Sequence, residues 1–154
     1  MFLYAFAFVL SKKLNRTLYI DAKSSFNKKM NFKNKRKMKY ELDIFSLSAF
    51  KANEKYCFNT FLKKIKRKFL KNFDYLRNKK NFLIENKNQT DSKIYNKIIK
   101  NIKFNDVLYI EGYFQSSNYF SNYRNELINE FKLKKKLKLF QITKKKLYLQ
   151  TQFL

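Results

Sequence analysis

The segment that most constrains the fold runs from Asp106 to Phe131, where an apolar stretch leads into the single glycine of the chain. Residues 107–110 are apolar side chains followed closely by Gly112, a pattern typical of a buried β-strand that ends in a turn. Beyond the turn, apolar residues recur three and four positions apart, which predicts an amphipathic helix. These residues are Tyr119, Phe120, Tyr123, Leu127, Ile128 and Phe131. The segment therefore predicts a strand, a turn and a helix, and open α/β folds place their ligands at such turns.

Size and composition indicate one domain and exclude some chemistry. The 154 residues, 45% of them hydrophobic, supply enough apolar surface for one core. The chain has no proline and no histidine, so its turns lack one of their usual residues, and a histidine metal ligand or catalytic base is excluded. The single cysteine, Cys57, excludes an internal disulfide. We expect it to be a small buried hydrophobe in the apolar face of a helix.

The charge of the chain is strongly unbalanced, with 36 lysines and arginines against 11 acidic residues and a formal net charge of +25. Self-repulsion of this size opposes a compact fold and favours a polyanionic partner. Most of the excess is lysine, which is less suited than arginine to bidentate recognition of phosphates and bases. We prefer a bias toward amino acids with A/T-rich codons as the explanation. A nucleic-acid-binding protein is the alternative, although the sequence contains no recognisable RNA- or DNA-binding motif.

The first ten residues are all apolar or aromatic. They are too few to span a bilayer, which takes about 20 apolar residues. Their positive charges follow the apolar stretch, whereas a signal peptide carries them before it. We therefore expect a buried helix that ends near Asn15. Residues 17–22 then predict a short strand closed by Asp21.

Three further segments complete the expected order of elements. Residues 39–47 predict a short strand or extended segment that places Glu41 and Asp43 on one face, residues 81–85 predict a strand, and residues 92–102 a short helix. Paired carboxylates suggest acid–base chemistry, but without an apolar wall to raise a pKa we prefer two solvated charges. The order of elements predicts an α/β fold with a partly parallel sheet.

The clearest helix is predicted for Lys55 to Arg77, where apolar residues recur at helical spacing and basic residues occupy the other sides. The apolar residues are Phe58, Phe61, Leu62, Ile65, Phe69, Phe73 and Leu76. We expect this stripe to pack against the protein's own sheet. Alternatively, the helix lies on an anionic membrane surface, which would make the chain a peripheral membrane-binding protein.

Three blocks of the sequence are similar, in order, to the N-terminal part of glycosyltransferase family 11, the bacterial α-1,2-fucosyltransferase type. The first is MFLYA at Met1, with the helix after it and LYID at residues 18–21. The second is KYELDIFSL, residues 39–47, and the third and most specific is GYFQSSNYFSNYRNEL, residues 112–127. The signature residues of the third block are Gly112, Tyr113, Phe114, Gln115, Tyr119 and Phe120. Residues 51–105 match weakly.

The resemblance implies an inverting transfer of fucose from GDP-fucose to a hydroxyl of a galactoside-terminated glycan, without a metal or cofactor. It implies the N-terminal Rossmann-like half of a GT-B-type enzyme in the cytoplasm, at the inner face of the membrane if residues 55–77 bind there. The candidate substrate-binding residues are Asp21, Tyr113 and Gln115. Each has a structural alternative: a solvated charge for Asp21, a core residue for Tyr113, and a hydrogen-bonding residue at the start of the helix for Gln115.

The sequence departs from the family pattern at both ends. It begins where the family's GGLGNQ loop should just have ended, and Leu3 stands where the family usually has Gln. It stops before the H-x-R-R-x-D segment, whose arginines would hold the phosphates of the donor, and no arginine follows Arg124. We therefore expect a partial N-terminal domain at residues 1–131 and a lysine-rich tail at residues 132–154. We expect no catalytic residue in this chain and no activity from it alone.

Overall fold

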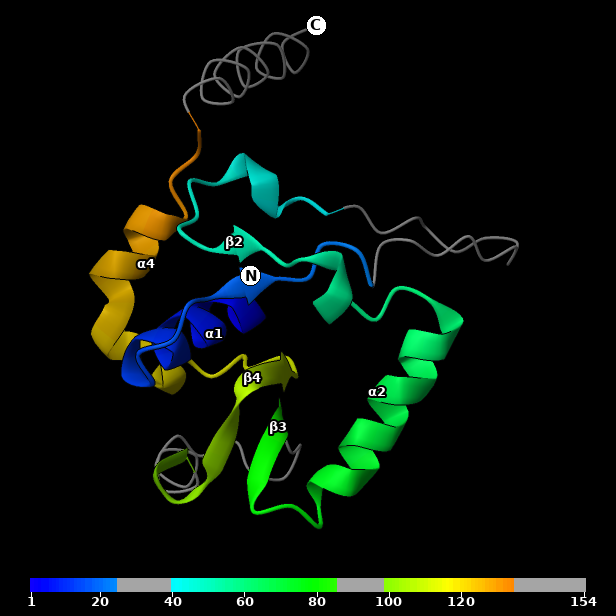
Figure 1. Cartoon of the computed structure of the whole chain (residues 1–154). Coiled ribbons are helices and arrows are strands. Elements are labelled where there is room, and N and C mark those ends of the chain that lie inside the picture. The colour runs from blue at the N-terminus through cyan, green and yellow to red at the C-terminus, as the bar shows by residue number, and fades with distance from the viewer. Residues whose placement is uncertain (25–39, 86–98, 135–154) are drawn as a thin grey trace, which may run out of the picture. The chain divides into compact units, whose positions relative to one another are not determined.

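The structure, a computed structural model, describes residues 1–24, 40–85 and 99–134 (Figure 1). The chain divides into two compact units, each built from segments that are distant in the sequence. The first unit comprises Met1–Met38 and Ala49–Tyr123, and the second comprises Lys39–Ser48 and Arg124–Leu154.

The first unit begins with helix α1, Phe2–Lys13. The residues from Tyr4 to Leu10 are all buried, which is the pattern of a helix enclosed on every side. Lys12 and Lys13 lie in the last turn, where the helix dipole favours positive charge. The expectation of a buried helix at the start of the sequence is confirmed.

Four strands of this unit form two parallel pairs (Figure 1). Strand β1 (Tyr19–Ile20) pairs with β2 (Phe50–Lys51), and β3 (Lys79–Ile84) pairs with the longer β4 (Lys103–Glu111). The expected class, a mixed α/β fold with parallel strands, is therefore confirmed, with each described sheet only two strands wide.

Helix α2, Phe61–Asp74, follows β2 and is capped by Thr60, whose hydroxyl accepts a hydrogen bond from the backbone N–H of Lys63. A threonine in this role favours a helix start at Phe61, several residues later than predicted. Residues Glu54–Tyr56 form a separate 3-10 turn instead. Cys57 and Phe58 lie between this turn and α2 and are both buried.

Asp74 joins the end of α2 to the start of β3. Its buried carboxylate accepts hydrogen bonds of 2.7 Å from the backbone N–H groups of Asn81 and Phe82 and from the side-chain amide of Asn81. The ammonium group of Lys80 donates to the backbone carbonyl of Asp74. The donors from Asn81 and Phe82 offset the cost of removing the carboxylate from water.

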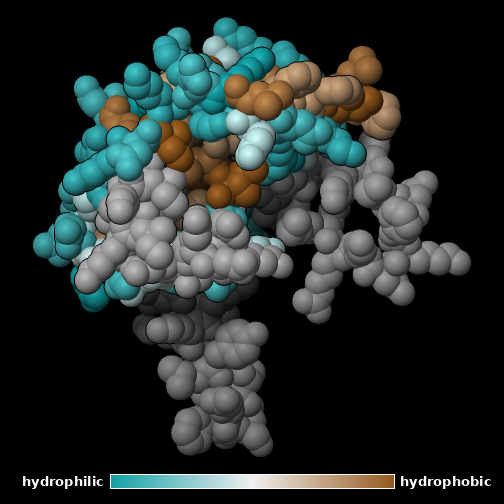
Figure 2. All heavy atoms as spheres, turned by 90° about the horizontal axis from the view of Figure 1, so that it is seen from below, coloured by the Kyte–Doolittle hydropathy of each residue, from teal (hydrophilic) through white to brown (hydrophobic). Residues whose placement is uncertain are grey.

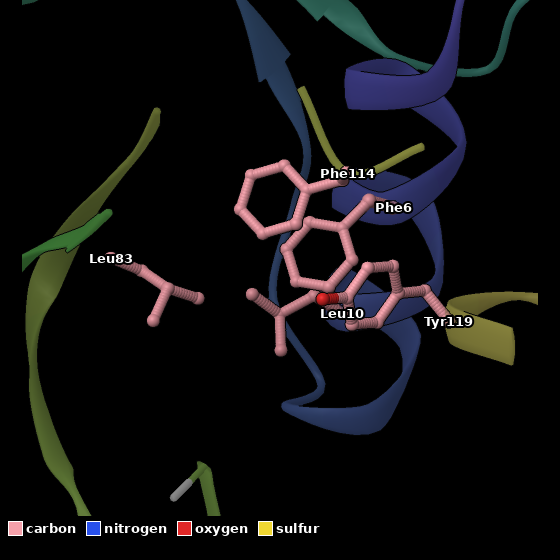
Figure 3. Packing of buried hydrophobic residues seen from close by; sticks show 5 residues of the cluster. All are labelled: Phe6, Leu10, Leu83, Phe114 and Tyr119. Carbon is pink, nitrogen blue, oxygen red and sulfur yellow. The ribbon is translucent and has the colours of Figure 1, made fainter. Parts of the chain in front are cut away.

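The core of the first unit brings together side chains from α1, β3 and the segment after β4 (Figure 3). They are Phe6, Leu10, Leu83, Phe114 and Tyr119. The rings of Phe6 and Phe114 stack in parallel, with centroids 3.8 Å apart. Tyr119 packs edge-on against both, at 5.4 Å and 5.8 Å. The segment that follows the only glycine therefore supplies two of the five central core residues.

The second unit contains helix α4, Arg124–Glu130, and the residues that precede β2. Phe45 and Leu133 form an antiparallel bridge. The ring of Phe45 packs edge-on against Phe131, with centroids 5.4 Å apart. The tail predicted from residue 132 onward is described as far as residue 134, which takes part in this pairing through its backbone N–H.

Two predicted elements differ in the structure. Residues Leu42–Ile44 form a 3-10 turn rather than part of a strand, so Glu41 and Asp43 do not lie on one face of an extended segment. Both are exposed. The helix predicted after Gly112 is also divided, because 3-10 turns at Ser117–Tyr119 and Ser121–Tyr123 precede α4.

Of the helix predicted at residues 92–102, the structure describes residues 99–102, and residues 99–101 are helical. The remaining part of that helix lies outside the described residues, as do residues 25–39 and the tail beyond residue 134.

Candidate functional site

The turn after β4 is built around Gly112 and Glu85. Gly112 has a φ of +154°, which residues with side chains rarely adopt. A Cβ atom at this position would lie 2.5 Å from the Cβ atom of Glu85, far inside van der Waals contact. The Glu85 carboxylate accepts hydrogen bonds from the backbone N–H groups of Tyr113, at 2.7 Å, and Phe114, at 2.8 Å. Glycine is therefore required where the backbone passes this carboxylate.

The turn sends neighbouring side chains in opposite directions. Phe114 is 0% exposed and has a φ of +49°, an uncommon conformation for a bulky residue that its packing in the core maintains. Tyr113 is 75% exposed, and Gln115 is also exposed. Tyr113 is therefore not a core residue, because Phe114 occupies that position. We call residues 112–115 with Glu85 the Gly112 turn.

The aromatic pair of the signature block, Tyr119 and Phe120, packs within the protein. Tyr119 is buried in the core, and Phe120 is half-buried and stacks on Phe2 of α1 with ring centroids 6.3 Å apart. Of the six signature residues, Phe114, Tyr119 and Phe120 therefore support the turn, and Tyr113 and Gln115 reach solvent.

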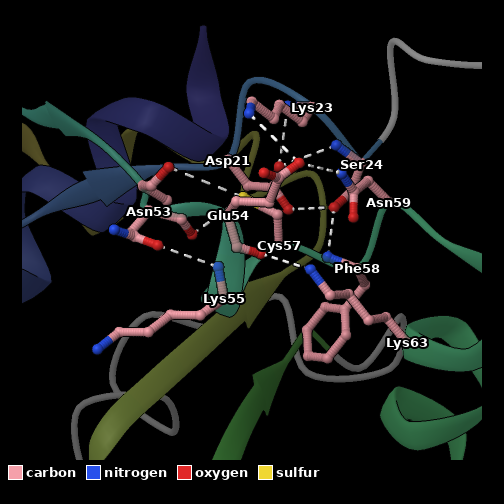
Figure 4. A network of polar contacts seen from close by, with 11 residues as sticks. Asp21, Lys23, Ser24, Asn53, Glu54, Lys55, Cys57, Phe58, Asn59 and Lys63 are labelled. Atoms are coloured by element: carbon pink, nitrogen blue, oxygen red, sulfur yellow. Dashed lines mark hydrogen bonds and ion pairs between the residues drawn. The ribbon is translucent and has the colours of Figure 1, made fainter.

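Asp21 follows β1 and organises a second polar network (Figure 4). Its Oδ1 atom accepts hydrogen bonds of 2.9 Å from the backbone N–H groups of Lys23 and Ser24, and the Ser24 hydroxyl donates to Oδ2. The Ser24 Oγ atom in turn accepts a 2.6 Å hydrogen bond from the backbone N–H of Phe58. Asp21 is therefore a half-buried residue that ties two segments together, rather than a charge surrounded only by water. We call these residues, with Cys57, the Asp21 network.

Burial and hydrogen bonding act in opposite directions on Asp21. Partial burial raises the pKa of its carboxyl group, but the hydrogen bonds from Ser24 and Lys23 lower it by more than burial raises it. The net pKa therefore lies below the ordinary value of 3.8. Burial and the nearby Asp21 charge raise the pKa of the Cys57 thiol. Cys57 is 1% exposed, and both features disfavour a nucleophilic thiolate. Its expected role as a buried hydrophobe is confirmed, although it precedes α2 instead of lying in a helix.

Three basic residues of α2, which we call the inner basic row, face the rest of the first unit. They are Lys63, Arg67 and Lys71. Arg67 donates to the carboxylate of Glu111 through Nε at 2.8 Å and Nη2 at 2.6 Å, and Lys71 pairs with the other carboxylate oxygen. Lys63 donates to the backbone carbonyl of Glu54 at 2.7 Å. The inner basic row thus contacts Glu111, which directly precedes the Gly112 turn at the end of β4. It also contacts Glu54, which lies three residues before Cys57 of the Asp21 network.

Five apolar residues of α2 lie on the opposite side and are exposed, whereas Leu70 is half-buried. Phe61 is 76% exposed, Leu62 77% and Phe69 58%. The full set, which we call the outer apolar face, is Phe61, Leu62, Ile65, Phe69 and Phe73 of α2, with Leu76 just after its end. The expectation that the predicted stripe packs against the protein's own sheet is wrong for these six residues, whereas Phe58, the first residue of that stripe, is buried and packs against Phe82 of β3 and Tyr109 of β4. The helix instead turns three of its cations, the inner basic row, toward the protein, where the half-buried carboxylate of Glu111 requires a partner.

Sequence reasoning missed the two glutamates that organise the site. Glu85 and Glu111 are the residues at the carboxyl ends of β3 and β4, and the backbone N–H of Glu85 donates to the carbonyl of Glu111 at 2.9 Å. The sequence feature that could have identified them is a glutamate directly after each apolar segment. Their roles depend on the pairing of β3 with β4, which the sequence does not specify.

Comparison with known proteins finds no match to a family model, to a curated protein or to a solved structure. Within the parts of the chain that the structure describes, Cys, Asp and Glu side chains do not form a group that could hold a metal ion.

Proposed function

We propose that the chain is the N-terminal, acceptor-binding portion of an α-1,2-fucosyltransferase of glycosyltransferase family 11. Three sequence blocks in the order of that family support this proposal. The parallel strand pairs are compatible with the Rossmann-like half of a GT-B-type enzyme. In this proposal, the acceptor is a galactoside and the donor is GDP-fucose.

The observation that carries the proposal is the placement of Tyr113 and Gln115. Both side chains leave the Gly112 turn toward solvent at the carboxyl end of a parallel strand. A tyrosine offers an apolar ring face and a hydroxyl, and a glutamine amide both donates and accepts hydrogen bonds. A sugar presents the matching chemistry, with apolar C–H faces and hydroxyl groups. The buried Phe114 and the Glu85 hydrogen bonds hold the turn in place, which limits the entropy lost on binding.

The carboxylates nearest this turn are already used for structure. Glu85 accepts two backbone N–H groups, and Glu111 is paired with Arg67 and Lys71. A general base must reach the proton it removes, and these contacts turn both carboxylates toward the protein. We therefore assign acceptor binding, and not proton transfer, to the Gly112 turn.

Acceptor binding is tested with lactose as the galactoside, using ligand-observed NMR on the full chain. We expect binding that Tyr113→Ala weakens on the order of tenfold, because a well-placed aromatic contact contributes more than about 1 kcal/mol. Tyr75→Ala is the matched control, since Tyr75 is 88% exposed and lies at the end of α2. Lactose binding that is undetectable, or equally weakened in both variants, would contradict the proposal.

The expectation that this chain alone does not transfer fucose is tested separately with GDP-fucose and lactose. We expect no fucosylated product from this chain alone by mass spectrometry. Product formation would show that a catalytic group is present and would overturn the restriction to acceptor binding.

A further inference from the structure

The outer apolar face lies directly opposite the side of α2 that packs on the protein. Successive helical residues are rotated by about 100°, so Phe61, Leu62, Ile65, Phe69 and Phe73 of α2 fall on one side, and Lys63, Arg67, Lys71 and Asp74 on the other. The contacts of the inner basic row with Glu54 and Glu111 hold this orientation. The exposed apolar side is therefore determined by the fold of the first unit. The space-filling view in Figure 2 likewise displays hydrophobic residues at the surface among hydrophilic ones.

Positive charge borders the outer apolar face on both edges. Lys66 lies beside one edge, Lys64 and Lys68 lie beside the other, and all three are exposed. The only acidic residue of α2 is Asp74, which is buried and hydrogen-bonded to Asn81 and Phe82. No acidic side chain of α2 itself therefore offsets these lysines at the surface.

We propose that the outer apolar face binds the surface of a lipid bilayer that contains anionic headgroups. A short helix with an apolar face, flanking lysines and phenylalanines matches the chemistry of the interface, where rings enter the acyl boundary and ammonium groups meet phosphates. With 14 residues, α2 is too short to span a bilayer, and in this proposal it lies in the plane of the surface. Among the described residues, no helix is both long enough and apolar enough to cross a membrane. This inference does not depend on galactoside binding.

Charge favours the bilayer over a second copy of the chain as the occupant. Each copy has a formal net charge of +25. Two outer apolar faces in contact would bring Lys64, Lys66 and Lys68 of both copies together, and like charges at an interface cost several kcal/mol. An anionic lipid surface removes this repulsion and covers the same apolar side chains.

A tryptophan probe tests the proposal, because the chain contains no tryptophan. Phe69→Trp places the probe in the outer apolar face, and Tyr113→Trp places a control on the exposed Gly112 turn. With vesicles of phosphatidylcholine and phosphatidylglycerol, we expect both chains to co-sediment but only the Phe69→Trp emission to shift to shorter wavelength. With phosphatidylcholine alone, we expect neither co-sedimentation nor a shift. Co-sedimentation without the shift would overturn the proposal, since it would mean that charge alone attracts the chain.

Phe69→Trp emission that is already shifted without vesicles would also overturn the proposal. Light scattering would then identify a dimer if a second copy covers the face, and a monomer if another part of the chain does.

Charge-matched variants test the flanking lysines. Each lysine near an anionic surface contributes about 1 kcal/mol, so replacing Lys64, Lys66 and Lys68 by glutamine should weaken vesicle binding on the order of 100-fold. The control replaces Lys79, Lys100 and Lys103, which are exposed and lie outside α2, at or near the starts of β3 and β4. We expect less than about tenfold weakening there. Equal losses in the two triple variants would overturn the assignment of the binding surface to α2.

Discussion

Gly112 and Glu85 depend on each other in the turn after β4. The Glu85 carboxylate satisfies two backbone N–H groups that would otherwise need another partner. It can approach them because Gly112 has no side chain to block it. The turn then directs Phe114 into the core and Tyr113 to the surface. The exposed tyrosine, on which acceptor binding depends in our proposal, is therefore positioned by residues that do not contact a ligand.

Replacing Gly112 tests this arrangement. Gly112→Ala would place a methyl group 2.5 Å from the Cβ atom of Glu85 at an unfavourable φ, so we expect a loss of about 2 kcal/mol or more in the free energy of unfolding. Urea denaturation measures the change. Gln115→Ala, at an exposed position of the same turn, is the control and should be within about 0.5 kcal/mol of the parent chain. Equal stability of the Gly112→Ala chain would contradict the structure of the turn.

Asp21 makes the stability of the chain vary with pH in the acidic range. Its pKa is below 3.8 in the folded state because hydrogen bonds from Ser24 and Lys23 outweigh the effect of burial. A depressed pKa means that the folded state binds this proton less readily than the unfolded state. The contribution of Asp21 to stability is therefore complete above the unfolded value and is lost as the pH falls through the folded value.

Asp21→Asn should remove this dependence. We expect the parent chain to be more stable than the variant near neutral pH, by no more than about 1 kcal/mol because the site is partly exposed. The difference should shrink as the pH falls below 3.8, the ordinary value for the group. Urea unfolding at several pH values measures it. A difference that stays constant down to about pH 2 would contradict the assigned hydrogen bonds.

Helix α2 illustrates that the periodicity of an element does not decide which of its faces packs. Its apolar residues share one side as predicted, yet the opposite side contacts the protein through Arg67 and Lys71. These cations also lie over aromatic rings: Arg67 is 5.8 Å from the centroid of Phe58, and Lys71 is 5.6 Å from that of Phe82. Cation–π contacts and ion pairs with Glu111 together provide the inward attraction.

The junction between α2 and β3 depends on Asp74. Asp74→Ala would leave the buried N–H of Phe82 and the two Asn81 donors without their acceptor. We expect a loss of about 3 kcal/mol, because unsatisfied buried donors each cost about 1–3 kcal/mol. Thermal and urea unfolding measure it. The control Asp106→Ala removes an exposed aspartate of β4 and should change stability by less than about 0.5 kcal/mol. Similar losses in the two variants would contradict the role of Asp74.

The whole molecule carries a formal net charge of +25, which opposes its compact state. Ion pairs such as those of Glu111 with Arg67 and Lys71 neutralise only part of this charge locally. The remaining cations repel one another in the compact state more than in the expanded unfolded chain. An anionic surface or a screening salt should therefore stabilise the folded chain.

We expect the melting temperature to rise with sodium chloride. The Debye length falls from about 30 Å at 0.01 M to about 8 Å at 0.15 M ionic strength, which screens repulsion across the molecule. Differential scanning fluorimetry measures the shift, and an equal osmolality of sucrose is the control. A melting temperature that falls with salt would mean that attractive ion pairs outweigh the repulsion.

Local patterns predicted several elements correctly. The apolar stretch at the start predicted α1, and apolar residues near 17–22, 81–85 and 107–110 predicted β1, β3 and β4, because burial and extended propensity are visible within a few residues. Strand β2 was not predicted, since a two-residue strand exists only through its pairing with β1. In the candidate site, Asp21, Tyr113 and Gln115 were expected after strand ends, whereas Glu85 and Glu111 were not.

Neighbouring residues are sufficient to specify the α/β class, the buried first helix and the need for a turn at Gly112. Three other outcomes required the folded chain: Phe114 and not Tyr113 is buried, Glu85 holds the turn, and α2 presents its apolar side to solvent. These outcomes depend on contacts between segments far apart in the chain. Such contacts form only when β3 pairs with β4 and α2 packs its inner basic row against Glu111, and periodicity within one segment carries no information about them.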